Sequence, residues 1–275
     1  MSRARVVVVT GASRGIGRAI AVDLAREGGR MLLVARDAAG LQEVAAAVAA
    51  AGAEAVSVAA DLGTAAGRQA VVAAVEAEGD LDVLVNNAGV EIPVSVLDHR
   101  PEDIDQEITI NLVAPLQLTR ALLPGMVARG HGVVVMVSSM SGKSPTPWNA
   151  VYTATKHGLV GFTSSLAIEL QGTGVHAGVV CPGFVAEAGM WANTGIKAPL
   201  SLREVPLSAV TGAVRAVIGG RGEVLVTQGP VRPLLALAQL FPGLTPKVLG
   251  WMGVLDVLRD RARHTAQVRG GSDRR

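Results

Sequence analysis

The sequence predicts an α/β fold, a single doubly wound domain in which helices cover both faces of a seven-stranded parallel sheet. Short valine-rich runs alternate with longer segments of helical periodicity, as expected for buried parallel strands joined by crossover helices. The composition agrees, because 49% of the 275 residues are hydrophobic and only 3% are aromatic. Such a composition suits small-residue helices packed on a parallel sheet.

The alternation can be followed element by element. The expected strands are residues 5–9, 30–35, 55–59, 81–85, 133–137, 175–181 and 223–227. The expected helices are residues 18–27, 38–51, 64–78 and 102–129, and a helix through Tyr152 and Lys156 to about Leu170. Pro115 predicts a kink or local break in the fourth helix. Ligands of such folds bind beyond the carboxyl ends of the strands, so we expect the functional residues at that edge.

Charge and cysteine usage argue against several classes of protein. The formal net charge is +2, and no basic run with interleaved aromatic residues indicates nucleic-acid binding. Cys181 is the single cysteine, so an intrachain disulfide is impossible and a reducing, cytoplasmic location is expected. The first apolar run is too short for a signal peptide. No two of the five histidines stand four residues apart, and we expect no metal site.

A glycine-rich turn joins the first strand to the first helix. Gly11, Gly15 and Gly17 follow a β-branched run and precede a helical pattern. Glycines let backbone N–H groups approach a phosphate, and the amino end of a helix adds a partial positive charge. The turn therefore predicts a dinucleotide site, although its GxxxGxG spacing differs from the general GxGxxG fingerprint.

The end of the second strand predicts which dinucleotide binds. In a doubly wound fold this position faces the adenosine ribose, where an acid selects the free 2′-hydroxyl and an arginine suits a 2′-phosphate. Arg36 follows the strand, and Arg14 lies in the glycine turn. We therefore expect NADP(H) to be preferred over NAD(H). In the alternative interpretation Arg36 is a solvated loop charge and Asp37 caps the helix 38–51.

The stretch from Ser138 to Gly158 holds the predicted chemistry. Tyr152 and Lys156 stand four residues apart, so on a helix they share one face. An ammonium group beside a phenol lowers the pKa of the tyrosine, which suits a general acid for carbonyl reduction. This spacing alone also occurs by chance in solvated helices. Ser139 at a strand end and Asn111 on the preceding helix favour the catalytic interpretation.

Together these pieces resemble the short-chain dehydrogenase/reductase family, in particular its β-ketoacyl reductases. The matching motifs are TGASRGIG from Thr10 to Gly17, Asp61-Leu62, NNAG from Asn86 to Gly89, Asn111, Ser139, Tyr152 with Lys156, and Pro182-Gly183. The resemblance implies a Rossmann-type fold, a nicotinamide cofactor, and a homodimer or homotetramer formed through the long helices after the fourth and fifth strands.

The same resemblance implies a role for each residue. Tyr152 exchanges a proton with the substrate oxygen, and Ser139 hydrogen-bonds that oxygen. Lys156 holds the nicotinamide ribose, and Asn111 keeps a water in place. Besides Tyr152 and Lys156, the implied cofactor-binding residues are Gly11, Ser13, Arg14, Gly15, Ile16, Gly17, Arg36, Asp61, Leu62, Asn87, Gly89, Pro182, Gly183 and Val185. For Asn86 a structural bridge between strands is an equal alternative.

Two parts of the chain depart from the family pattern. Glu187 stands where a threonine often contacts the nicotinamide amide or phosphate, which leaves that contact in doubt. Beyond a catalytic domain of residues 1–229, residues 230–275 form a C-terminal extension. Its apolar run between Pro233 and Pro246 is too short to span a bilayer.

The segments expected to choose the substrate are the loop 186–206 and the extension. Met190, Trp191 and Ile196 give the loop the composition of a lid over an apolar substrate, although an ordinary packed loop is the alternative. A helix is expected from Thr245-Pro246 onward, with a stripe formed by Val248, Met252, Leu255 and Leu258. The stripe could pack on a partner subunit or line the substrate entrance; contact with a membrane surface is the less favoured alternative. Residues 270–275 are expected to be disordered.

The leading hypothesis is an NADPH-dependent reductase that acts on a small apolar ketone, such as a 3-oxoacyl thioester, a steroid-like ketone or another lipid. It rests on the Asn111, Ser139, Tyr152 and Lys156 set together with the two arginines. The alternatives are an NAD-dependent alcohol or hydroxysteroid dehydrogenase and a non-catalytic dinucleotide sensor or scaffold.

Overall fold

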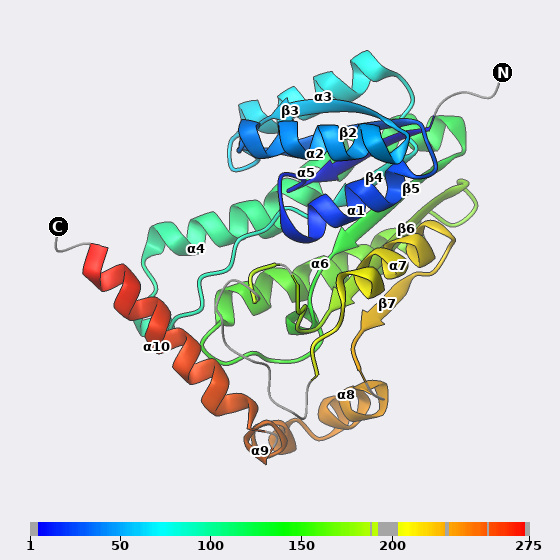
Figure 1. Ribbon diagram of the computed structural model, residues 1–275. Helices are drawn as coiled ribbons and strands as arrows, with labels where there is room; N and C mark the ends of the chain where they lie inside the picture. Colours follow the sequence, from blue (N-terminus) through cyan, green and yellow to red (C-terminus); the bar gives the residue numbers. More distant parts are fainter. Residues whose placement is uncertain (1–4, 188, 192–202, 229–230, 252, 273–275) are drawn as a thin grey trace.

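The computed structural model describes residues 5–187, 189–191, 203–228, 231–251 and 253–272. Its centre is a parallel sheet of seven strands in the order β3-β2-β1-β4-β5-β6-β7 (Figure 1). The strands are β1 (Val6–Thr10), β2 (Arg30–Ala35), β3 (Glu54–Ala59), β4 (Val83–Asn86), β5 (Gly132–Val137), β6 (Val175–Pro182) and β7 (Glu223–Val226). The predicted fold class is confirmed, with strand ends shifted by at most two residues.

Helices cover both faces of the sheet because the strand residues alternate between two apolar cores. On β1, Val7 and Val9 belong to one core, whereas Val6 and Val8 belong to the other, as the two-residue period of a strand requires. The first core is closed by α1 (Gly15–Ala25), α2 (Ala38–Ala51) and α7 (Leu207–Ile218). The second is closed by α3 (Ala65–Glu78), α5 (Ala114–Arg129) and α6 (Ala150–Glu169).

The helix predicted over 102–129 is a rod of three segments. These are α4 (Pro101–Ile108), a π-helical turn (Thr109–Val113) and α5. The predicted local break is present, and it lies just before Pro115, which stands in the first turn of α5. The rod is long and apolar enough to cross a membrane by length and composition alone. Its residues Ala114, Leu118 and Met126, however, are buried against the sheet.

The C-terminal extension forms three helices below the carboxyl edge of the sheet (Figure 1). They are α8 (Val231–Leu240), α9 (Thr245–Trp251) and α10 (Val254–Ser272). The predicted start at Thr245 is confirmed, whereas α7 and α8 were not predicted. Residues 270–272 are the last residues of α10, and the disorder expected from residue 270 onward stays a prediction. Residues 273–275 and Met252 lie outside the described residues.

Candidate active site

The glycine turn after β1 packs so closely on neighbouring backbone that two of its glycines have no space for a side chain. Gly11 has a φ of +66°, and a Cβ there would lie 2.9 Å from the Cα of Ala88. A Cβ on Gly17 would lie 2.1 Å from the carbonyl oxygen of Gly11. Arg14 precedes α1 and does not cap it with its side chain. The side chain of Arg14 therefore leaves the first N–H groups of α1 uncapped. These N–H groups and the helix dipole can stabilise an anion at this end of the helix.

Asn87 closes this turn against the end of β4. Its Nδ2 donates to the carbonyl oxygen of Thr10 at 2.9 Å, and its backbone N–H donates to the Oγ1 of Thr10 at the same distance. The amide thus holds the two strand ends together, and Asn87 also lines the cavity described below. For Asn86 the expected bridge between strands is not what the geometry shows: its Nδ2 donates to the Oγ1 of Thr119 at 3.2 Å, which joins β4 to α5.

Two arginines flank the far end of the turn. Arg14 and Arg36 are both exposed, both line the cavity, and neither forms an ion pair with the described residues. Asp37 caps α2 by accepting the N–H of Gly40 at 3.1 Å, as the alternative interpretation proposed for this residue. The carboxylate of Asp61 similarly accepts the N–H of Gly63 at 2.9 Å, so its charge is partly used to shape the loop after β3.

The predicted catalytic side chains meet at the ends of β5 and α6. Tyr152 and Lys156 lie on one face of α6, with the Lys156 Nζ 5.4 Å from the centroid of the tyrosine ring. The Nζ also donates to the carbonyl oxygen of Val137 at 3.0 Å. Ser139 lines the same cavity, and its interaction with the Tyr152 hydroxyl lowers the pKa of that group. All three side chains line one cavity at the carboxyl edge of the sheet.

The proton affinities of this pair differ from the sequence-based expectation. We expected Lys156 to lower the pKa of Tyr152. In the protein by itself, burial raises that pKa and the Glu91 carboxylate raises it further, whereas the hydrogen bond with Ser139 lowers it. Burial also lowers the pKa of Lys156 to about 8. Desolvation is the largest cause in both cases because both side chains are almost fully buried.

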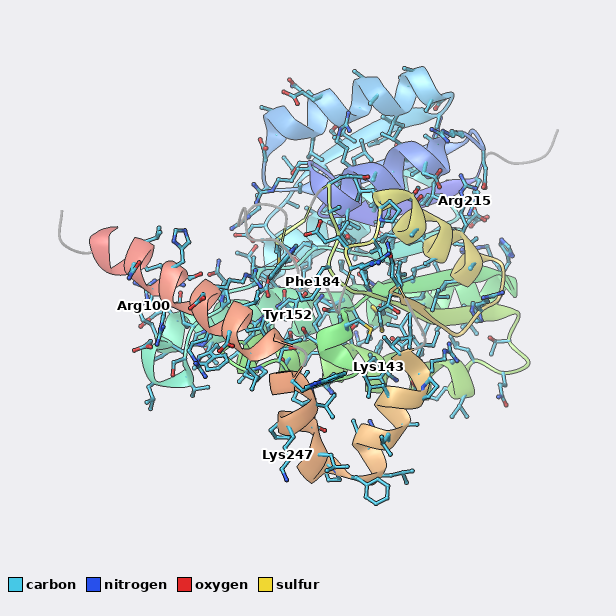
Figure 2. All side chains as sticks on the ribbon, turned by 60° about the horizontal axis from the view of Figure 1, so that its bottom comes forward. Arg100, Lys143, Tyr152, Phe184, Arg215 and Lys247 are labelled. Carbon is cyan, nitrogen blue, oxygen red and sulfur yellow. The ribbon has the colours of Figure 1, made fainter. Side chains whose placement is uncertain are left out.

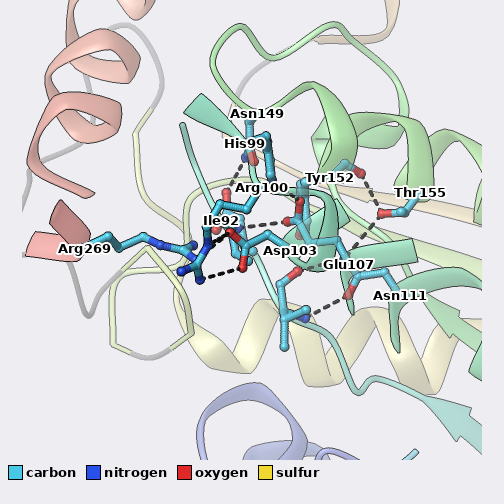
Figure 3. A network of polar contacts seen from close by, with 12 residues as sticks. Ile92, His99, Arg100, Asp103, Glu107, Asn111, Asn149, Tyr152, Thr155 and Arg269 are labelled. Atoms are coloured by element: carbon cyan, nitrogen blue, oxygen red, sulfur yellow. Dashed lines mark hydrogen bonds and ion pairs between the residues drawn. The ribbon is translucent and has the colours of Figure 1, made fainter. Parts of the chain in front are cut away.

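Asn111 lies in the π-helical turn and uses its side chain to bind protein groups (Figure 3). Its Oδ1 accepts the N–H of Val90 at 2.8 Å, and its Nδ2 donates to the carbonyl oxygen of Val90 at 2.8 Å. The Nδ2 also approaches the Oγ1 of Thr155 at 3.3 Å. The amide therefore ties the loop after β4 to α6. The water expected at Asn111 remains a prediction.

The loop after β6 explains the departure at Glu187. Val185 is buried, lines the cavity and pairs with Val205 in a short parallel bridge. Glu187 accepts the N–H of Leu207 at 3.1 Å, at the start of α7, where a carboxylate is favoured by the helix dipole. Trp191 packs against Phe184 in a tilted arrangement, with ring centroids 4.3 Å apart. Ile196, the third apolar residue of the predicted lid, lies outside the described residues.

One continuous cavity of about 840 Å³ joins these groups. Every residue predicted for catalysis or cofactor binding lines it except Asn111, which stands behind the wall. Its outer wall comes from the extension, including Leu234, Leu244, Val248 and Leu258. Val248 and Leu258 belong to the predicted apolar stripe, and their position agrees with the alternative in which the stripe lines the substrate entrance.

Sequence reasoning missed an ion pair that closes the cavity. Arg261 on α10 donates to both carboxylate oxygens of Glu91, at 2.8 and 2.7 Å. Asn149 also donates to this carboxylate, and the guanidinium lies 5.4 Å from the ring of Trp191. Both charged side chains are only 8% exposed. No local pattern reveals the pair, because the partners stand 170 positions apart.

The residues present fit a dinucleotide. A narrow glycine turn at the amino end of a helix suits a pyrophosphate. Two guanidinium groups that form no ion pair within the described part of the chain suit a further phosphate. The buried Lys156 and Tyr152 lie at the other end of the same cavity. Gly11, Arg14, Arg36 and Lys156 are the residues that would hold it.

This fold and this site define a nicotinamide-dependent oxidoreductase of the Rossmann type. The chain belongs to the short chain dehydrogenase family, whose model matches residues 5–198. It is 38% identical to the ketoacyl reductase HetN of Nostoc sp. over 94% of this chain and 93% of that protein.

Solved structures agree with the family. A metagenomic short-chain oxidoreductase in complex with NADP superposes with a TM-score of 0.70 at 37% identity, covering 82% of this chain and 97% of that one. A variant of actinorhodin polyketide ketoreductase with NADPH superposes with a TM-score of 0.74 at 32% identity, covering 81% and 95%.

Proposed function

We propose that the protein uses NADPH to reduce an apolar ketone to a secondary alcohol, with Tyr152 as the proton donor. The observation that carries the proposal is the joint position of Ser139, Tyr152 and Lys156 in a cavity whose opposite end holds Arg14 and Arg36. The similarity to a ketoacyl reductase and to proteins solved with NADP or NADPH supports it. A cytoplasmic location and a homodimeric or homotetrameric state remain predictions.

When bound, the nicotinamide would supply the hydride. The protein would stabilise the negative charge that develops on the substrate oxygen. Ser139 donates a hydrogen bond to that oxygen, and Tyr152 donates its proton. The raised pKa of Tyr152 keeps the phenol protonated until the oxygen becomes basic enough to take the proton. The pKa of Lys156 is lowered to about 8. In its protonated form Lys156 then stabilises the negative charge of the Tyr152 phenolate.

The cavity wall supports an apolar substrate. The extension contributes leucine and valine side chains to the cavity that Tyr152 lines, and the loop after β6 adds Phe184 and Trp191. Such a wall gains free energy by removing apolar substrate surface from water, about 25 cal/mol per Å². A 3-oxoacyl chain or a steroid-like ketone has the surface to use it.

The test is NADPH oxidation with a panel of ketones by wild type and by Tyr152→Phe. We expect the variant to lose about 10²–10⁴-fold in kcat, the usual contribution of a positioned general acid, with a much smaller change in the dissociation constant for NADPH. Equal rates in the two proteins would remove Tyr152 from the mechanism. NADPH binding without turnover on any ketone would instead support the cofactor-sensor alternative.

The cofactor preference has its own test. Arg36→Asp removes a positive charge from the cavity and adds a negative one, so we expect NADPH binding to weaken about 10–100-fold, as for the loss of a hydrogen bond to a charged group. NADH binding should change much less. Arg18→Asp on the exposed face of α1 is the matched control, because Arg18 does not line the cavity. Equal effects of the two substitutions on both cofactors would contradict the preference.

A further inference from the structure

The segment of residues 231–251, here called the tail arm, carries an unusual concentration of exposed apolar side chains. It comprises α8, a short 3-10 turn (Pro242–Leu244) and α9. Half of the twelve exposed large hydrophobic residues of the described chain lie in it: Leu234, Leu237, Leu240, Phe241, Leu244 and Trp251. Leu240 is 74% exposed and Trp251 is 89% exposed. An apolar surface of this kind marks an interaction site.

The tail arm is held at the edge of the molecule rather than within it. None of the residues of α8 or α9 is buried, and the arm projects beyond the carboxyl edge of the sheet in both views (Figures 1 and 2). The helices that follow β-strands elsewhere in the fold bury an apolar face against the sheet, but this pair does not. Its outer face is therefore available to another surface.

The charges of the arm select the kind of surface. Arg232 and Lys247 are its charged residues, and the arm has no Asp or Glu. Lys247 points away from the body of the protein at the outer end of the arm (Figure 2). Apolar side chains combined with basic ones, and an exposed tryptophan, are the chemistry that binds the headgroup region of an anionic lipid bilayer.

The cavity reaches the same surface. Leu234, Leu237 and Leu244 line the cavity that contains Tyr152, and they are also 37%, 45% and 43% exposed. A second copy of the chain seated on the arm would cover this opening. A lipid surface would instead place the opening against the acyl chains, from which an apolar substrate can pass without crossing water.

We propose that the tail arm docks the protein on an anionic lipid surface and that the cavity draws its substrate from that surface. The docking stands on the exposed side chains and charges of the arm. The second statement rests on the proposed reduction of an apolar ketone.

Flotation of the full-length protein with vesicles tests the docking. Wild type should float with vesicles of phosphatidylcholine and phosphatidylglycerol, and at least about tenfold more weakly with phosphatidylcholine alone, because two basic side chains favour anionic lipid. The variant Leu240→Ser/Phe241→Ser/Trp251→Ser removes apolar side chains that do not line the cavity. It should lose at least about tenfold in vesicle binding. The matched control is Val96→Ser/Leu97→Ser/Val268→Ser, whose three residues are equally exposed elsewhere.

The outcomes separate the two proposals. Failure of wild type to float, or equal flotation of the tail-arm variant and wild type, would overturn the docking. A dimer that dissociates only in the tail-arm variant, without flotation of wild type, would assign the surface to a second copy and overturn it as well. Turnover of a water-soluble ketone without vesicles should be the same in both variants and wild type. If wild type did not turn over the water-soluble ketone, the reductase function would be contradicted, whereas the flotation result would still hold.

Discussion

At the scale of single residues, the environment of Tyr152 sets how it holds its proton. The side chain is 8% exposed, and burial together with Glu91 raises its pKa. A lysine four residues away is not enough to reverse this, because Lys156 is itself buried and its pKa is lowered to about 8. A phenol of this kind is a proton donor that releases its proton only to a strong developing base.

Tyr152 is the only tyrosine of the chain, so its ionisation can be followed directly by the phenolate absorbance band. We expect no phenolate at pH 10.0, the ordinary tyrosine pKa, as long as the protein without added cofactor remains folded. Stability conferred by the neutral phenol is lost as pH rises above that value, since the unfolded chain releases the proton first. The urea-unfolded protein, which should titrate near pH 10.0, is the control. Reversible ionisation below pH 10 in the folded state would refute the raised pKa.

At the scale of elements, α4 and the connection that precedes it carry a second buried polar pair, Glu107 and His99 (Figure 3). Glu107 accepts the N–H of Ile92 at 2.9 Å, and its other oxygen lies 3.2 Å from the Nε2 of His99. Burial raises the pKa of Glu107 to about 7 and lowers the pKa of His99. The pair therefore favours the neutral forms of both side chains, because desolvation disfavours the charged form of each. It holds the loop after β4, whose Glu91 and Val90 line the cavity.

This pair predicts a pH-dependent stability. The folded protein keeps a proton on Glu107 that the unfolded chain releases near pH 4.5, so this group makes stability fall as pH rises from 4.5 to 7, by up to about 1.4 kcal/mol per pH unit. Glu107→Gln keeps an acceptor for the N–H of Ile92 without titrating. We therefore expect the free energy of unfolding of Glu107→Gln, measured with urea, to rise relative to that of wild type between pH 4.5 and 7. The control Glu102→Gln, on the exposed face of α4, should show no such rise. If the free energies of unfolding of wild type and Glu107→Gln changed in parallel with pH, the effect would be ruled out.

At the scale of the whole molecule, the C-terminal extension folds back as part of the catalytic body. Along α10, Val254, Leu258 and Ala262 are buried at helical spacing. Arg261 binds Glu91 beside the site, and Arg269 binds Asp103 on α4 at 2.6 Å. The helix therefore joins the cavity wall to the start of the long rod, and its apolar stripe is used within the protein.

Substitutions of Arg261 test how much its ion pair with Glu91 contributes to the stability of the protein. Arg261→Met leaves the Glu91 carboxylate buried without its cation, which should destabilise the protein by about 3–5 kcal/mol. Glu91→Gln combined with Arg261→Met should recover most of that loss, because no unpaired charge is left. Arg263→Met breaks only an exposed pair with Asp260 and should stay within about 0.5 kcal/mol of wild type. Urea unfolding measures all three, and equal losses for Arg261→Met and Arg263→Met would refute the structural role of the pair.

Local patterns were enough to predict the sheet, the glycine turn and the positions of Ser139, Tyr152 and Lys156. The two-residue period of buried strands, the spacing of glycines and the face shared by residues four apart are properties of neighbouring residues. Even the break before Pro115 follows from the missing N–H group of one residue.

Only the tertiary structure decided what surrounds those residues. It placed Arg261 on Glu91 across 170 positions, used Glu187 at the start of α7, and raised rather than lowered the pKa of Tyr152. It also placed the exposed side chains of the tail arm at the mouth of the cavity. The physical reason is common to these cases: desolvation and ion pairing depend on which distant segments exclude water together, and no local period of the sequence records that.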